Sequence, residues 1–518
     1  MPICRSAAQG LGVPNQAGSA APELVAGRVV NGVSDAPLPR ALVQLGSRAM
    51  LTDGEGRFHF EQSGQPVGSI RATKPGFLSS PEQNDGFGGG SVDAADATSV
   101  TVTLWPEALL AGRVLGPDGE PLPHIAVQAR RSIFDEQGHR MQVSGQSQTD
   151  SHGQFRLPVP AGDYLVESQF SQRGFERDQA VMPVSYPPPL SGVGTPMLHV
   201  GPGEEQQMEL RPQVSRTYVV TLPLDGEEGP PPRITARSSA GITFSANGFR
   251  SQAPGVVRIN LPPGSYTLHA TRFSRDGVQF GDSSVTVPDH DVTGAPLHLT
   301  ALPAIPVDLV ADTSASSSAV RTQANPPNLM QFNLVLEPTD ADPASPFQFG
   351  VRPTQQREGV MTMAAPPGSY RLSAGSTAGW YIKSAFSRGA DLTRDLLVVS
   401  PSASPSPITL LISNQTGSVE GTAKLAGTPA ACWIYLVANG PALSRIVIRR
   451  SDASGSFRIT DLAPGSYRAV AFAFRHSADL EDPAILGHYA THLGSVSVAA
   501  GTAATLNLEA VTTKEMLR

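Results

Sequence analysis

The chain has 518 residues, a net charge of −7 and 40% hydrophobic residues, enough apolar material for several packed domains. Only 16% of the residues are charged, whereas 51 are glycine and 47 are proline, a composition typical of short strands joined by tight turns. The mild negative charge argues against a nucleic-acid partner, no apolar run is long enough for a membrane-spanning helix, and Cys4 and Cys432 give no disulfide framework.

The first 23 residues are expected to form a disordered leader, because they are small, polar and lack the apolar core of a signal peptide. The sequence SAAQG at residues 6–10 nevertheless resembles the tail of a signal-peptidase site. Two interpretations therefore stay open: a leader without structure, or a natural start that lies further upstream.

A short motif, Gly-Ser/Asp-Tyr/Ile, recurs along the chain. Its copies begin at Gly68, Gly162, Gly264, Gly368 and Gly465. The spacing of about 100 residues is the length of one small β-sandwich domain. The sequence therefore predicts five tandem sandwiches, with soft boundaries for the third and fourth, at residues 24–106, 107–212, 213–303, 304–413 and 414–518.

The residues around the motif predict its local structure. An Asp-x-x-Gly turn at Asp53, Asp150 and Asp452 precedes three of the copies. A run of alternating apolar and polar residues follows each turn, which is typical of a strand with one buried face. After a Pro-Gly element, a second alternating run contains the motif. We expect the repeated stretch to be a hairpin whose tyrosine anchors the core.

Each copy also has an opening and a closing strand, and the closing strand of one copy leads to the next opening strand within a few residues. Successive modules are therefore expected to stack end to end. The polar stretches at residues 84–99 and 312–328 lack periodicity and are expected to be disordered.

The run AGRVLGPDGEPLPHIAVQA…TDSHGQFRLPVPAGDYLVES, between Ala111 and Ser168, resembles the carboxypeptidase regulatory-like domain family. These domains are transthyretin-like β-sandwiches related to the collagen-adhesin B-type repeats. The resemblance is good for the second and fifth modules, fair for the first, and limited to the central stretch of the third and fourth.

The resemblance implies an all-β fold of tandem seven-stranded Greek-key sandwiches, Ig-like or prealbumin-like. It also implies a non-enzymatic bacterial scaffold or adhesion-type protein, extracytoplasmic in the periplasm, on the outer cell surface or secreted. The alternative is a carbohydrate-binding protein, because some members of neighbouring folds bind starch or other glycans. An enzyme is the weakest hypothesis, so we expect no catalytic residue, cofactor or metal. We expect a monomer with a glycan or an envelope protein as partner.

Adhesin-type relatives can form an intramolecular isopeptide bond between a first-strand lysine and a last-strand asparagine, beside a buried acid. Only Lys424 and Asn507 fall near those strands, and no acid follows Tyr467. We therefore expect no such bond, because an unassisted lysine is protonated and is no nucleophile.

Two histidines, His488 and His492, lie four residues apart in a helix predicted at residues 483–493 and capped by Asp482. They would share one face, as metal ligands can, but no third ligand is evident, which favours a surface or packing pair. The same helix is expected to cover the apolar face of the strand that follows Tyr467. The alternative is an exposed patch for a partner.

Trp380 and Tyr381 lie together in a predicted loop and are the best candidates for an aromatic platform that binds a glycan. The alternative is that these loop aromatics fold back on the core.

Overall fold

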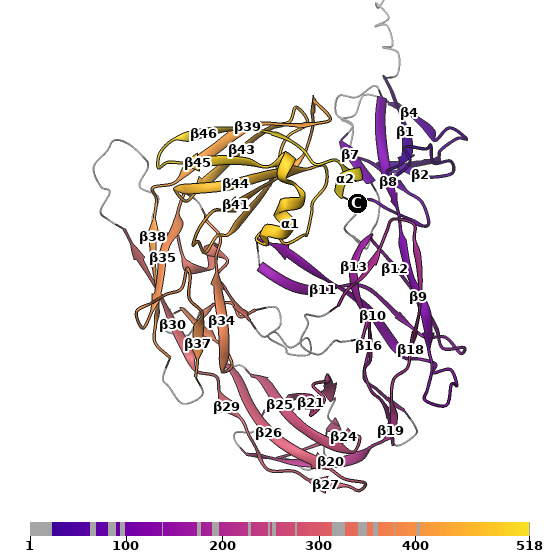
Figure 1. Ribbon diagram of the computed structural model, residues 1–518, viewed down its shortest axis with the longest axis vertical. Helices are drawn as coiled ribbons and strands as arrows, with labels where there is room; N and C mark the ends of the chain where they lie inside the picture. Colours follow the sequence, from indigo (N-terminus) through magenta and orange to yellow (C-terminus); the bar gives the residue numbers. More distant parts are fainter. Residues whose placement is uncertain are drawn as a thin grey trace, which may run out of the picture. The chain divides into compact units, whose positions relative to one another are not determined.

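The computed structural model is all β apart from short helices (Figure 1). The chain divides into two compact units, one of residues 1–79 and 85–105 and the other of residues 80–84 and 106–518. Of the predicted leader at residues 1–23, residues 1–22 lie outside the described residues, and Glu23 already belongs to the first strand. The described residues are 23–62, 69–80, 90–93, 99–136, 138–173, 178–188, 196–225, 229–246, 249–250, 255–274, 277–312, 327–339, 350–355, 361–377, 379–400 and 405–516.

The first unit holds the first sandwich. Its strands are β1 (Glu23–Asn31), β2 (Leu42–Leu45), β3 (Arg48–Leu51), β4 (Arg57–Gln62), β5 (Ser69–Thr73), β6 (Phe77–Leu78), β7 (Gly90–Asp93) and β8 (Ser99–Pro106). They form two four-stranded sheets, in the orders β4-β1-β8-β6 and β3-β2-β5-β7. Of the stretch 84–99 that we expected to be disordered, residues 84–89 and 94–98 lie outside the described residues, whereas β7 corrects the expectation for residues 90–93, because it pairs antiparallel with β5. Such backbone pairing does not require the apolar alternation that this stretch lacks.

The second sandwich begins the second unit. Its strands are β9 (Ala108–Val114), β10 (Ala126–Asp135), β11 (Gly138–Gln148), β12 (Gln154–Val159), β13 (Gly162–Ser168), β16 (Ser185–Tyr186), β17 (Leu198–Val200) and β18 (Glu205–Leu210). One sheet has the order β12-β9-β18, and the other has the order β11-β10-β13-β16 with β17 also on β13. A separate small sheet consists of β14 (Ser171–Arg173), β15 (Gln179–Val181) and β19 (Val214–Arg216).

The third sandwich has two five-stranded sheets. Its strands are β20 (Tyr218–Asp225), β21 (Arg233–Ser238), β22 (Thr243–Ala246), β23 (Phe249–Arg250), β24 (Val256–Leu261), β25 (Gly264–Ser274), β26 (Gly277–Val287), β27 (Val292–Thr293), β28 (Leu297–His298) and β29 (Thr300–Ala301). One sheet has the order β23-β24-β20-β27 with β28 also on β20, and the other has the order β22-β21-β25-β26-β29. Phe170 and Met182, which precede it in the chain, pack against its core.

The fourth sandwich pairs a six-stranded sheet, β32-β33-β30-β38-β35-β36, with a three-stranded sheet, β31-β34-β37. Its elements are β30 (Ala304–Ala311), the 3-10 helix η1 (Leu329–Phe332), β31 (Val335–Pro338), β32 (Thr354–Gln355), β33 (Met361–Ala364), β34 (Gly368–Ser373), β35 (Tyr381–Ser387), β36 (Ala390–Asp391), β37 (Leu397–Val399) and β38 (Ile408–Ser413). Of the second stretch that we expected to be disordered, residues 313–326 lie outside the described residues.

The fifth sandwich has seven principal strands and the two-residue β40. Its elements are β39 (Gly417–Leu425), β40 (Thr428–Pro429), β41 (Trp433–Ala438), β42 (Ile446–Arg450), β43 (Ser456–Leu462), β44 (Gly465–Phe472), α1 (Pro483–His488), η2 (Ala490–His492), β45 (Gly494–Val498), β46 (Ala503–Glu509) and α2 (Thr513–Met516). One sheet places β39 between β43 and β46, and the other has the order β42-β41-β44-β45.

All five sandwiches share one pairing pattern, as expected for Greek-key domains. The opening strand pairs antiparallel with the strand before the motif and parallel with the closing strand, as β9 pairs with β12 and β18. The parallel pair is tight. A Cβ atom on Gly112 would lie 2.1 Å from the Met208 carbonyl oxygen, and one on Gly421 would lie 1.6 Å from that of Leu506. Only glycine fits at these two positions.

The predicted Asp-x-x-Gly turns are confirmed. The Asp150 carboxylate accepts the backbone N–H groups of His152 at 2.8 Å and Gln154 at 2.9 Å, and Gly153 has a φ of +69°. These bonds hold the pKa of Asp150 below its ordinary value, chiefly through the Gln154 amide. The residues that follow the turn alternate as expected, with Phe155 and Leu157 buried.

The repeated stretch is not a hairpin, which corrects our expectation. The strand before the motif belongs to one sheet and the strand that contains it belongs to the other, since β12 pairs with β9 whereas β13 pairs with β10. The Pro-Gly element therefore carries the chain across the core. Alternation alone does not distinguish the two cases, because neighbouring strands and facing strands bury alternate residues equally well.

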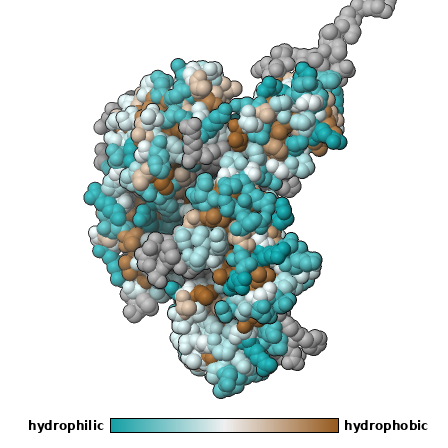
Figure 2. Space-filling model, turned by 45° about the vertical axis from the view of Figure 1, so that its right-hand side comes forward, coloured by the Kyte–Doolittle hydropathy of each residue, from teal (hydrophilic) through white to brown (hydrophobic). Residues whose placement is uncertain are grey.

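The motif tyrosine is a core anchor, as predicted. Tyr164, Tyr370 and Tyr467 are buried, and each hydroxyl donates to the carbonyl oxygen four residues earlier, at 2.7–2.8 Å. The ring fills the core while the hydroxyl fixes the backbone of the crossing, as in the tyrosine corner of immunoglobulin-type sandwiches. The face shown in Figure 2 is largely hydrophilic with small hydrophobic groups, in keeping with apolar strand faces that point inward.

Tyr467 offers a direct test in the isolated segment 414–518, whose independent folding is itself a prediction. Tyr467→Ala should lower the free energy of unfolding by about 3–5 kcal/mol, because it leaves a cavity. Tyr467→Phe should lower it by about 0.5–1.5 kcal/mol, the usual contribution of one hydrogen bond. Urea unfolding followed by circular dichroism measures both values.

The same series predicts a pH dependence. Burial raises the pKa of Tyr467 to about 12, above the value of about 10 in the unfolded chain. The contribution of Tyr467 to the free energy of unfolding is therefore fully present below the unfolded pKa, and it is lost as the pH rises through the folded pKa. The Tyr467→Phe variant should therefore lose less stability than the parent between these two pH values. Equal losses in both proteins, or a segment without a cooperative transition, would contradict the tyrosine's role or the boundary at residue 414.

Candidate functional site at the junction of three sandwiches

The outer face of the fifth sandwich is covered, as the sequence predicted. Helix α1 lies beside β41 and β44 (Figure 1). Asp482 caps it by accepting the Ala484 N–H at 2.8 Å, and Leu486 is buried in the packing against the sheet. We name this packing the outer cluster. Its buried members are Phe134, Tyr435, Val437, Ile446, Ile448, Val470, Phe472, Leu480, Leu486 and Val511, with Trp433, Tyr489, Leu493 and Met516 packed against them.

One member of the outer cluster, Phe134, comes from the second sandwich. It lies at the end of β10, beside the turn into β11, and its side chain is only 2% exposed. Its ring stacks on His139, with centroids 4.5 Å apart and planes at 29°. The tip formed by β10 and β11 therefore inserts an aromatic side chain into the fifth sandwich.

Backbone and polar contacts fix the tip in place. The Phe134 N–H donates to the Ser477 carbonyl at 3.0 Å, and Arg131 donates to the Ser477 hydroxyl. The Glu136 carboxylate accepts the Ile448 N–H at 3.0 Å and an Arg449 N–H at 2.8 Å. These contacts run along β42 and the segment after β44, so the tip is held on two sides.

A buried arginine adds the fourth sandwich to the junction. Arg445 donates one N–H to Glu481 at 2.8 Å and another to Glu337 at 3.2 Å, and all three side chains are at least three-quarters buried. Glu337 also accepts the Ser373 hydroxyl within the fourth sandwich. A Cβ atom on Gly138, at the start of β11, would lie 2.2 Å from the Glu337 carboxylate. The hairpin tip thus fits closely against both sandwiches.

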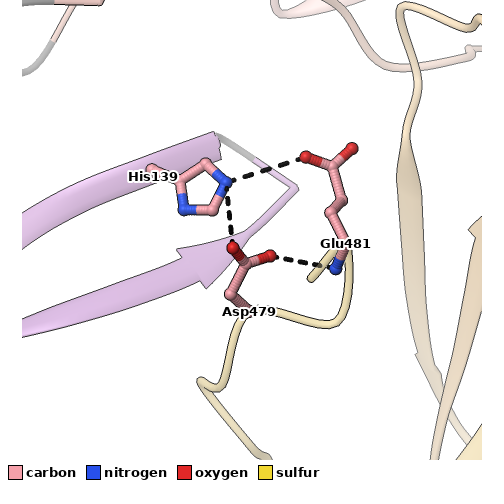
Figure 3. A group of neighbouring side chains, drawn as sticks. All are labelled: His139, Asp479 and Glu481. Carbon is pink, nitrogen blue, oxygen red and sulfur yellow. Dashed lines mark hydrogen bonds and ion pairs between the residues drawn. The ribbon is translucent and has the colours of Figure 1, made fainter. Parts of the chain in front are cut away.

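His139 faces two carboxylates beside this arginine (Figure 3). Its Nε2 atom lies 3.7 Å from an oxygen of Asp479 and 3.7 Å from an oxygen of Glu481. Burial alone would raise the pKa of Glu481, but His139 and Arg445 outweigh it and hold that pKa below its ordinary value. Glu481 is therefore ionised at neutral pH. It faces His139 of the second sandwich and pairs with Arg445 of its own, fifth sandwich.

This junction differs from the expected end-to-end stacking, in which only modules adjacent in sequence touch. Within the second unit, the second sandwich contacts the fifth, because β10 and β11 are long enough to carry their tip beyond their own core. Our sequence interpretation missed Phe134. A signal was present, since Ile133 and Phe134 are consecutive apolar residues, both buried, where one-sided burial requires alternation.

The two residues of the predicted aromatic platform differ in their burial. Trp380 is only 7% exposed and packs with Phe332 and Ile412, whereas Tyr381 is half-buried at the start of β35. The tryptophan thus follows the alternative in which a loop aromatic folds back on the core. A ligand-binding role for the pair stays a prediction that depends on Tyr381.

The other candidate residues lie apart from the junction. His488 is exposed on α1, while His492 contacts the Glu509 carbonyl and the Glu515 carboxylate. Lys424 is exposed and lies opposite Glu509 in the strand register. The Asn507 side chain accepts the Thr422 N–H at 3.1 Å.

A second feature of the same unit is a cleft between the second and third sandwiches. It is open to solvent, has a volume of about 570 Å³ and is lined by polar side chains that include Gln128, Gln169 and Ser185. Arg130 and Glu167 also line it and pair at 3.4 Å. Its aromatic components are Phe170 and Phe244, which stack with centroids 4.3 Å apart.

Comparisons with known proteins assign no family. No family model and no curated protein matches the chain. Among solved structures, it is similar to the Bacillus anthracis TIE protein at 9% identity, over 95% of this chain and 69% of that one, with a TM-score of 0.16. It is similar to the shaft pilin SpaA from Lactobacillus rhamnosus GG at 12% identity, over 37% of this chain and 98% of that one, with a TM-score of 0.13. The minor pilin GBS52 from Streptococcus agalactiae matches at 14% identity, over 40% of this chain and 99% of that one, with a TM-score of 0.19. These TM-scores and identities are too low to support a functional assignment, and the fold class follows from the strand pairing.

The junction predicts a specific effect of Phe134→Ala. Docking of the hairpin tip should weaken by about 1.5–3 kcal/mol, the usual gain from burying a phenylalanine side chain. Because the Ile448 N–H donates to Glu136 on the tip, hydrogen exchange of residues 446–450 should become faster, which mass spectrometry measures. Val143→Ala on β11, where the side chain is 45% exposed, is the matched control and should leave exchange unchanged. Unchanged exchange in folded Phe134→Ala would show that the tip is not docked.

Proposed function

We propose that this protein is a non-enzymatic, extracytoplasmic scaffold or adhesion-type protein built of carboxypeptidase regulatory-like modules. The observation that carries the proposal is the junction, where a buried aromatic ring and a buried arginine tie three sandwiches together. A scaffold depends on modules that keep a fixed relation to one another. The buried Phe134 ring and the backbone hydrogen bonds to the hairpin tip support such a fixed relation between the second and fifth sandwiches.

The chemistry of the repeated residues supports a structural role. The motif residues are turn and core groups, and the lowered pKa values of Asp53 and Asp150 arise chiefly from backbone N–H groups in their turns. Burial raises the pKa of the Cys432 thiol to about 11, which keeps it protonated and unreactive at neutral pH. Among the described residues, no helix is both long and apolar enough to cross a bilayer.

Location tests the proposal directly. The protein should be expressed from its complete natural reading frame, with an epitope tag, in its source bacterium. Protease added to intact cells, or to cells whose outer envelope has been permeabilised, should degrade it while a cytoplasmic marker survives. Protection of the protein until the cytoplasmic membrane is broken would overturn the extracytoplasmic role. Chemical crosslinking in the same cells should capture an envelope protein or glycan.

Carbohydrate binding is the second candidate function, and the cleft between the second and third sandwiches favours it. Sugar-binding sites combine an aromatic face, which packs against C–H groups, with planar polar side chains that bind hydroxyls. Phe170 and the Arg130–Glu167 pair offer both kinds of group at one cleft. Tyr381 is the remaining candidate from the predicted platform.

A glycan array distinguishes these sites. If the cleft binds a sugar, Phe170→Ala should weaken binding of the best glycan severalfold, because it removes the aromatic face that would pack against the sugar. Tyr381→Ala should then bind as the parent does, and Trp380→Ala is a control for a buried tryptophan. Loss confined to Tyr381→Ala would assign binding to the loop instead, and an array without any signal would reject this second function.

A further inference from the structure

Three side chains at the junction have the composition and spacing of a metal site. One nitrogen of His139 and one oxygen each of Asp479 and Glu481 all lie within 4.8 Å of one another. Figure 3 shows the imidazole of the hairpin tip facing both carboxylates, which come from the segment between β44 and α1. The three groups therefore converge on one point from two different sandwiches.

The distances suit a shared cation better than direct hydrogen bonds. Both nitrogen-to-oxygen separations are 3.7 Å, beyond the usual hydrogen-bond range of about 2.7–3.2 Å. Two ligand atoms that each lie about 2.1 Å from a tetrahedral zinc ion are about 3.4 Å apart. Shifts of a few tenths of an ångström would therefore bring the imidazole nitrogen and each carboxylate oxygen to the separation expected of two zinc ligands.

The surrounding contacts already orient these groups. The second oxygen of Asp479 accepts the Glu481 N–H at 2.9 Å, which leaves the first oxygen directed at His139 (Figure 3). The His139 ring is held by stacking on Phe134. The Oε2 atom of Glu481, which lies 3.7 Å from His139, also accepts an Arg445 N–H at 2.8 Å, and a carboxylate oxygen has lone pairs for both contacts. Such outer contacts are what usually fix metal ligands in place.

We propose that His139, Asp479 and Glu481 bind a divalent transition-metal ion of the Zn²⁺ class. An imidazole nitrogen with two carboxylate oxygens suits zinc, whereas calcium and magnesium prefer sites made of oxygen alone. Water completes the coordination shell. The ion reduces the repulsion between the two carboxylates, and it joins the hairpin tip to the fifth sandwich. This inference goes beyond the scaffold function and does not depend on it.

The test uses the full chain, freed of metal with a chelator. Isothermal titration with ZnCl₂ should show one saturable ion per chain, and CaCl₂ should give no comparable binding. His139→Ala should weaken zinc affinity by about tenfold or more, since even outer-shell changes usually cost 10–100-fold. Co²⁺ should give a visible absorption band that His139→Ala loses.

Two controls separate metal binding from a general effect on folding. His488→Ala removes an exposed histidine from α1 and should bind zinc as the parent does. Parent and His139→Ala must also show the same circular dichroism in chelator. Because the ligands join two sandwiches, zinc should slow hydrogen exchange of residues 446–450 in the parent but not in folded His139→Ala. No saturable binding, or equal affinity in His139→Ala, would overturn the proposal.

Discussion

The crossing between the two sheets is the interaction on which every sandwich depends. The strand before the motif and the strand that contains it lie in facing sheets, and in the second, fourth and fifth sandwiches the motif tyrosine holds both ends of this step. Its ring fills the space between the sheets, while its hydroxyl donates to the backbone carbonyl four residues earlier and so fixes the backbone of the crossing.

Much of this architecture could be predicted, because turn and core residues carry local signals. The Asp-x-x-Gly turn at Asp150, the buried Phe155 and Leu157, and the capped helix over the fifth sandwich all follow from spacing and residue type. The sheet that each strand joins could not be predicted in the same way. Strand pairing is a contact between distant residues, and alternation is equally satisfied by a neighbour or by a strand across the core.

The candidate site was harder to predict for a related reason. Phe134, Arg445 and Glu337 lie in three sandwiches, and their meeting depends on how the sandwiches pack together. Each side chain alone is ordinary for a strand end or an edge. The aromatic pair at residues 380–381 shows the opposite case. Its predicted loop position made Trp380 a candidate for an exposed platform, but Trp380 packs against Phe332 and Ile412. The residue type indicates which interactions a side chain can make, and the packing around it decides whether that side chain is exposed to solvent.

The insertion of Phe134 also bears on the order in which the chain becomes structured during synthesis. The hairpin tip bonds to a residue 346 positions later, so the ribosome makes the tip long before the surface that buries it. At about 5–20 residues per second, the delay is roughly 17 to 70 seconds. Throughout that interval the second sandwich exposes an aromatic side chain at the end of a hairpin, a feature that chaperones recognise and that favours association with other nascent chains. Completion of the last sandwich thus buries the Phe134 side chain. A truncated product would therefore associate with other chains more readily than the finished protein does.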